Sequence, residues 1–98
     1  MKSERSSRLD HDGAERLAIA ALSFLSSDLD RLGRFLSTAG IGPETLRAAA
    51  EEPGFLAGVL EYLMNDEGLL VAFAEETRTR PTLVAAARYV LDPDAGED

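Results

Sequence analysis

The sequence has no cysteine and only one histidine, His11. Without cysteine there is no disulfide, no thiolate nucleophile and no zinc or iron–sulfur site of the cysteine type. A single histidine beside a polar amino-terminal segment, with no second histidine and no glycine-flanked serine, forms no metal or hydrolase motif. We therefore expect a protein that is not an enzyme and that carries no metal ion or cofactor.

Long hydrophobic runs are also absent. No stretch approaches the ~20 consecutive apolar residues that span a bilayer. The apolar segment Leu17–Leu25 is interrupted by Ser23 and does not lead to the small-residue cleavage site of a secretory signal. We expect no membrane association and a cytoplasmic location.

Basic residues are scarce. Ten Lys and Arg stand against eighteen Asp and Glu, for a formal net charge of −8. Lys2, Arg5 and Arg8 outweigh Glu4 in the first eight residues, so the excess of acid is concentrated in the rest of the chain. Such a surface repels the phosphates of nucleic acids, and it favours a basic protein partner.

Strand signals are missing, since apolar and polar residues do not alternate and no Asn-Gly or Asp-Gly hairpin turn occurs. Apolar residues instead recur at the three- and four-residue spacing of amphipathic helices. We predict an all-α fold, a compact bundle of five or six short helices in a single domain over residues 11–91. Residues 1–10 and the acidic residues 92–98 are expected to be disordered tails.

Polar residues predict where the first helices start and end. Asp12 with Glu15 predicts a capping box for a helix over about residues 13–26. Ser27 or Asp28 predicts the cap of the next helix. Gly40 follows its last periodic residue, where a left-handed residue commonly ends a helix.

Proline predicts where three later helices start. Pro43, Pro53 and Pro81 are each expected at the first position of a helix. Asn65 is expected to end one helix and to cap another. The apolar residues expected in the core at helical spacing include Leu29, Leu32, Phe35, Leu36, Ala39, Phe55, Leu60, Leu63 and Phe73.

Three segments carry a resemblance to a known family: Leu32–Leu36 leading to Gly40, Phe55–Leu60, and Asp66–Leu70 leading to Phe73–Ala74. Together they resemble a family of short acidic helical proteins from alphaproteobacteria, catalogued as a domain of unknown function. The resemblance extends over roughly residues 14–90. It implies a compact cytoplasmic helical domain, and it brings no activity, ligand or catalytic residue with it.

Arg31 and Arg34 are the first candidates for an interaction surface. They lie three residues apart and share a helix face, where they could grip a carboxylate or a phosphate. We favour the interpretation that they pair with the neighbouring acids Asp28, Asp30 or Asp66, because exposed pairs of this kind are common.

Asp66, Glu67 and Tyr62 complete the candidate surface. Adjacent helical residues diverge, so Asp66 and Glu67 do not converge on one ion, and capping of a helix start is the favoured interpretation. Tyr62 is the aromatic residue expected at the surface. Together with Arg31 and Arg34, these residues form the predicted site.

The segment 29–52 has the helix, glycine turn and helix of a helix-turn-helix. Its second helix would offer Glu44, Thr45, Arg47, Glu51 and Glu52, and this acidic face is unsuited to phosphates. A nucleic-acid-associated or transcriptional adaptor is therefore the alternative hypothesis. The favoured function is a non-enzymatic protein–protein interaction module that uses a helical surface, monomeric rather than homodimeric, since like charges oppose self-association.

Overall fold

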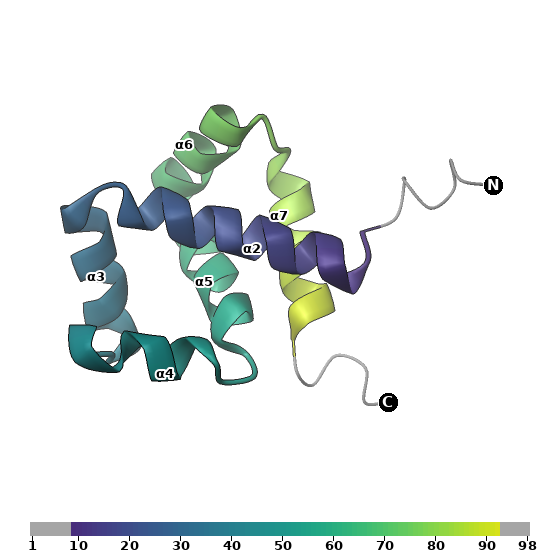
Figure 1. Ribbon diagram of the computed structural model, residues 1–98. Coiled ribbons are helices and arrows are strands. Elements are labelled where there is room, and N and C mark those ends of the chain that lie inside the picture. The colour runs from purple at the N-terminus through teal and green to yellow at the C-terminus, as the bar shows by residue number, and fades with distance from the viewer. Residues whose placement is uncertain (1–8, 93–98) are drawn as a thin grey trace.

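Helix α2 (His11–Ser26) is the longest helix among the described residues, and it crosses the front of the molecule in Figure 1. It packs most extensively against α7 (Pro81–Leu91), then against α5 (Phe55–Met64) and α3 (Leu29–Ala39). The computed structural model describes residues 9–92, and this range holds six α-helices and no strand, which confirms the predicted all-α bundle. The other helices are α4 (Leu46–Ala50), which follows a 3₁₀ turn at Pro43–Thr45, and α6 (Glu67–Thr77).

A stripe of small residues lets α2 lie close to its neighbours. Ala14, Ala18 and Ala21 follow each other at helical spacing, and all three are fully buried. Each presents only a methyl group, so the facing helices can approach the α2 backbone closely. Helix α7 contributes Val84 and Ala87 to the same core, also fully buried.

Large side chains fill the remainder of the core. The Phe73 ring meets the Phe24 ring edge to face, with centroids 5.5 Å apart. Leu60 and Leu63 from α5 are fully buried in the same cluster, and Phe55 is buried as well. The expected burial of Phe55, Leu60, Leu63 and Phe73 is therefore confirmed.

The predicted capping box at Asp12 and Glu15 is wrong. The Asp10 carboxylate caps α2 instead, accepting a hydrogen bond from the Gly13 amide at 2.8 Å. Both aspartates can cap a helix, and the earlier one does so because Leu9 packs against the core and fixes the chain there. Leu9 and Asp10 thus contribute to the folded part, although the sequence assigned them to a tail. Residues 1–8 and 93–98 of the predicted tails lie outside the described residues.

Helix α3 starts and ends as predicted. The Asp28 carboxylate accepts hydrogen bonds from the backbone amides of Asp30 and Arg31, at 2.9 and 3.3 Å. Gly40 ends the helix in the left-handed region with φ of 72°, and the Ile41 amide donates to the Leu36 carbonyl at 2.9 Å. This pattern satisfies carbonyls that the helix end leaves open.

The expected burial of Leu29 and Ala39 is wrong. Leu29 is 82% exposed and Ala39 is exposed, whereas Phe35 and Leu36 between them are buried. Leu29 is the first residue of α3, directly after the turn that follows α2, and its side chain does not reach the core. The apolar periodicity of α3 thus extends further than the core that it contacts.

Two later helix starts also differ from expectation. Helix α5 begins at Phe55 and not at Pro53, because Gly54 has a φ of 91°, which a right-handed helix cannot accommodate. Asn65 ends α5 as expected, but Asp66 caps α6, accepting from the Leu69 amide at 3.1 Å. Pro81 is the first residue of α7, as predicted.

The α3 cap gives a testable prediction. Replacing Asp28 by alanine removes the acceptor for two backbone amides, and we expect a loss of ~1 kcal/mol in the free energy of unfolding. Asparagine caps about as well as aspartate, so Asp28→Asn is the matched control and should stay within ~0.5 kcal/mol of the native value. Urea denaturation measures both variants, and equal losses in the two would contradict capping as the role of Asp28.

Candidate functional site

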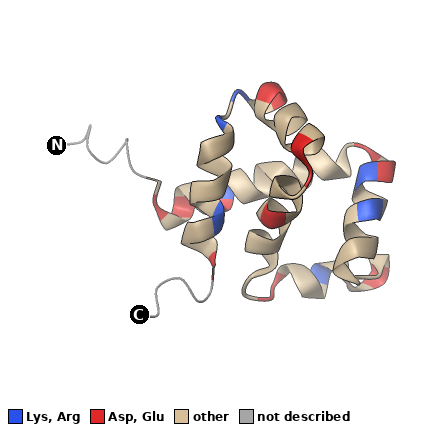
Figure 2. Cartoon of the chain, turned by 180° about the vertical axis from the view of Figure 1, so that it is seen from behind, with Lys and Arg blue, Asp and Glu red and all other residues tan. Residues whose placement is uncertain are grey.

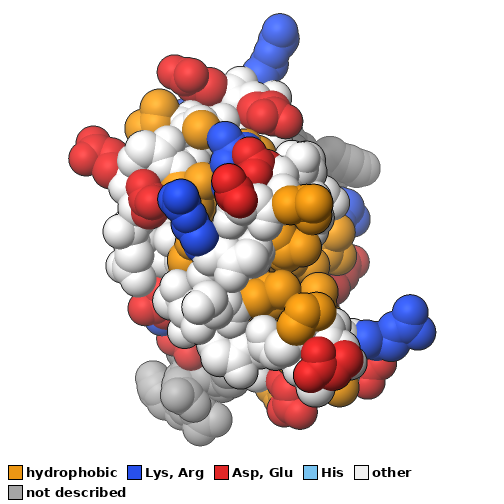
Figure 3. All heavy atoms as spheres, turned by 90° about the vertical axis from the view of Figure 1, so that its left-hand side faces the viewer, with side chains coloured by type: hydrophobic (Ala, Val, Ile, Leu, Met, Phe, Trp, Pro, Cys, Tyr) orange, Lys and Arg blue, Asp and Glu red, His pale blue; other side chains and the backbone are white. Residues whose placement is uncertain are grey.

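A groove lies between α3 and α5. In Figure 1, α2 runs past one end of these two helices and α4 lies at the other end. Its volume is about 330 Å³, in the lower part of the range for pockets that hold a ligand or a large side chain. Figure 3 shows hydrophobic side chains at the surface on the side of the molecule that includes α3. We call this feature the α3–α5 groove, and its lining residues are Phe35, Thr38, Ala39, Ile41, Gly54, Phe55, Gly58, Glu61, Tyr62 and Asn65.

Three aromatic rings build the walls of the α3–α5 groove. Phe35 from α3 meets Tyr62 from α5 with centroids 5.2 Å apart, and it meets Phe55 at 6.1 Å. The interplanar angles of 69° and 75° are edge-to-face contacts, which are favourable for aromatic pairs. Phe35 therefore ties α3 to α5 at the base of the groove and leaves space beside it. Tyr62, predicted as a surface aromatic, is half-buried on this wall.

Gly58 leaves space at the α5 wall of the groove, because it has no side chain. It lies in the middle of α5, where glycine costs roughly 0.5–1 kcal/mol relative to alanine. A Cβ atom built on Gly58 would meet no atom within 4 Å, so packing within the fold does not require glycine here. The space that a side chain at position 58 would enter belongs to the groove.

A carboxylate lies on the groove lining opposite α3. Glu61 Oε1 accepts a hydrogen bond from Arg88 Nη2 of α7 at 2.7 Å, and Arg88 Nη1 donates to Asp92 Oδ2 at 3.3 Å. The hydrogen bond to Glu61 raises the pKa of the Arg88 guanidinium. The lining of the groove contains no lysine or arginine.

A second hollow, of about 500 Å³, lies next to the groove, and Gly54 lines both. It is bounded by the start of α2, the connection between α4 and α5, and the end of α7. Figure 2 shows acidic positions along the α4–α5 connection. We call it the acidic hollow, because its charged lining residues are Glu15, Glu51, Glu52 and Asp92, with His11 and no lysine or arginine.

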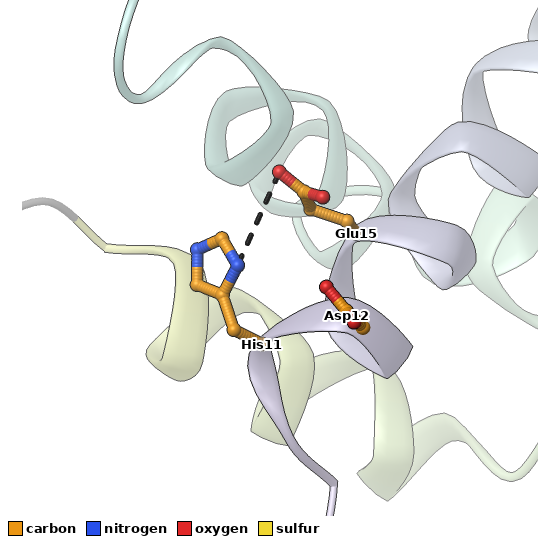
Figure 4. A group of neighbouring side chains, drawn as sticks. All are labelled: His11, Asp12 and Glu15. Atoms are coloured by element: carbon orange, nitrogen blue, oxygen red, sulfur yellow. Dashed lines mark ion pairs between the residues drawn. The ribbon is translucent and has the colours of Figure 1, made fainter.

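His11, Asp12 and Glu15 come together at the edge of this hollow (Figure 4). The His11 Nδ1 atom is 4.0 Å from Glu15 Oε2, and one ligand atom from each of the three residues lies within 4.8 Å of the others. The spacing of four residues between His11 and Glu15 could have indicated this grouping in the sequence. His11 and Asp12 are exposed and Glu15 is half-buried, and exposed acidic groups commonly lie together without an ion, so we assign no metal site to them.

The structure places Arg31 and Arg34 in different surroundings. The Arg31 guanidinium lies over the Phe24 ring, 4.5 Å from its centroid, in a cation–π contact. Among residues 9–92, the ion pairs are His11–Glu15, Glu61–Arg88 and Arg88–Asp92, so the favoured pairing of Arg31 and Arg34 with nearby acids is wrong. Aromatic contact replaces it for Arg31, and Arg34 is exposed.

Asp66 and Glu67 serve the start of α6. Asp66 is its cap and Glu67 its first residue, so the helix-capping interpretation is confirmed for Asp66.

In the helix-turn-helix segment, α4 is only five residues long. Glu44 in the preceding 3₁₀ turn, Arg47 on α4 and Glu51 directly after it are all exposed, and the acidic character expected from the sequence is retained at this surface.

The fold and the groove define a small all-α domain with an open, aromatic-walled surface groove. A family model described as "Protein of unknown function (DUF3572)" matches residues 11–94, and the chain belongs to this family. Comparisons with curated proteins and with solved structures gave no match. Within residues 9–92, no helix combines the length and the apolar character needed to cross a membrane.

Proposed function

We propose that this protein is a non-enzymatic protein–protein interaction module of the cytoplasm, and that the α3–α5 groove receives an apolar side chain of a partner segment. The observation that carries the proposal is the open groove walled by Phe35, Phe55 and Tyr62. Aromatic residues are enriched at the centres of protein interfaces, and one large anchor in a pocket commonly supplies much of the binding energy.

The alternative, a nucleic-acid-associated adaptor that uses segment 29–52, has less support. A reader of DNA presents basic and polar side chains from its second helix to phosphates and base edges. Here Arg47 is outnumbered by Glu44, Glu51 and Glu52. The charge of this surface favours a protein partner.

Selection from a library of displayed peptides tests the proposal without knowledge of the natural partner. We expect the native chain to enrich peptides with a large apolar residue, and Gly58→Leu to weaken their binding at least tenfold, because the leucine side chain would occupy the groove. The matched control is Gly33→Leu on α3, where an added Cβ also meets nothing within 4 Å and the position does not line the groove.

Backbone amide chemical shifts locate the peptide. Perturbations centred on Thr38, Gly58 and Tyr62 would support the groove as the binding site. If no peptide is enriched, or if both leucine variants bind the selected peptides like the native chain, the groove is not the interaction surface.

A further inference from the structure

The α3–α5 groove and the acidic hollow adjoin, and together they describe one binding surface. Gly54 lines both, so a segment seated in the groove can pass over a residue without a side chain into the hollow. The groove is walled by aromatic rings, and the hollow is bordered by carboxylates. The two parts therefore differ in the chemistry that they can recognise.

The residues that line the groove and the hollow differ in charge from the rest of the described residues. Residues 9–92 contain fourteen carboxylates and seven arginines, and none of those arginines lines the groove or the hollow. In the hollow, Glu51 and Glu52 are exposed on the α4–α5 connection, and they share the lining with Glu15 from α2 and Asp92 after α7. Glu15 lies near His11 and Asp92 pairs with Arg88, so Glu51 and Glu52 are the acids most open to an incoming cation.

We infer that the partner is a basic amphipathic protein segment, with an apolar anchor in the α3–α5 groove and neighbouring lysine or arginine side chains in the acidic hollow. This inference rests on the proposed function and adds the chemistry of the partner to it. Charge complementarity of this kind sets the specificity and the association rate of a complex. It also explains why an acidic segment or a second copy of this acidic chain is a poor occupant.

Two synthetic peptides of roughly 15 residues, about 22 Å long when helical, test the inference. Both carry the same leucine and phenylalanine anchors, and they differ only in having arginine or glutamine at the remaining positions. We expect the native chain to bind the arginine peptide at least tenfold more tightly than the glutamine peptide at ~50 mM salt. The preference should largely disappear near 1 M salt, where the screening length is about 3 Å.

Charge reversal locates the acidic part of the surface. The double variant Glu51→Lys/Glu52→Lys should bind the arginine peptide about tenfold more weakly than the native chain, and the glutamine peptide equally well. Glu75→Lys/Glu76→Lys changes the net charge by the same amount at an exposed pair on α6, outside the groove and the hollow. This control should retain nearly all of the affinity for the arginine peptide.

The outcomes separate the inference from the function on which it rests. If both peptides bind equally and Gly58→Leu weakens both, the groove is an interaction site and the basic partner is wrong. If both charge-reversal variants weaken the arginine peptide alike, the attraction comes from net charge and the hollow has no special part. If Gly58→Leu changes the binding of neither peptide, the proposed function fails together with the inference.

Discussion

Replacing Phe73 by alanine is expected to lower the free energy of unfolding by ~3–5 kcal/mol. The side chain is 0% exposed, and its ring meets Phe24 edge to face at 5.5 Å. The Arg31 guanidinium lies over the Phe24 ring, so the substitution also removes the ring that supports Phe24 beneath this cation–π contact. Domains of this kind hold only ~5–15 kcal/mol in total, so the variant should be close to unfolding.

Urea denaturation measures the effect of Phe73→Ala, with Tyr89→Ala as its control. Tyr89 is an aromatic residue of α7 that is 64% exposed, and its removal should change the free energy of unfolding by no more than ~0.5 kcal/mol. A loss below ~1 kcal/mol for Phe73→Ala would mean that the ring does not support the core.

Replacing Ala18 by leucine is expected to lower the free energy of unfolding by ~1–3 kcal/mol, although leucine is the more hydrophobic residue. Ala18 is 0% exposed in the stripe along which α2 meets its neighbours. Leucine adds three carbon atoms where a methyl group now fits, so α2 would have to move away from the helices packed on it. The effect would show that close helix approach, and not only apolar area, stabilises this fold.

The control for Ala18→Leu is Ile19→Leu, at the next position of the same helix. Ile19 is 52% exposed, and this exchange keeps the volume, so we expect a change within ~0.5 kcal/mol. Thermal or urea unfolding compares the two variants. An Ala18→Leu variant that is as stable as the native chain would mean that the interface of α2 has unused space.

The sequence predicted the features that depend on neighbouring residues. Asp28, Gly40 and Pro81 mark helix boundaries because a carboxylate cap, a left-handed glycine and a proline act within one turn. Asp10 and Asp12 can both cap α2, and local sequence patterns do not show which of them does so. Asp10 caps α2 in place of Asp12 through the packing of Leu9, which is a tertiary contact.

The groove could not be predicted from the sequence, because it depends on how far α3 stands from α5. Phe35 and Tyr62 are 27 residues apart, and periodicity assigns each to an apolar face without pairing them. Only the structure shows that the space beside Gly58 is a groove. The stacking of Arg31 on Phe24 likewise requires the turn between α2 and α3.

The packing of α2 against α7 has a consequence for how this chain is made. Ribosomes add ~5–20 residues per second, so about 3–13 s separate the synthesis of Ala18 from that of Val84. During this interval, the alanine face of α2 lacks α7, its most extensive partner. Completion of the native state therefore follows the arrival of α7, and a nascent chain that stalls before Pro81 would expose apolar surface to chaperones and proteases.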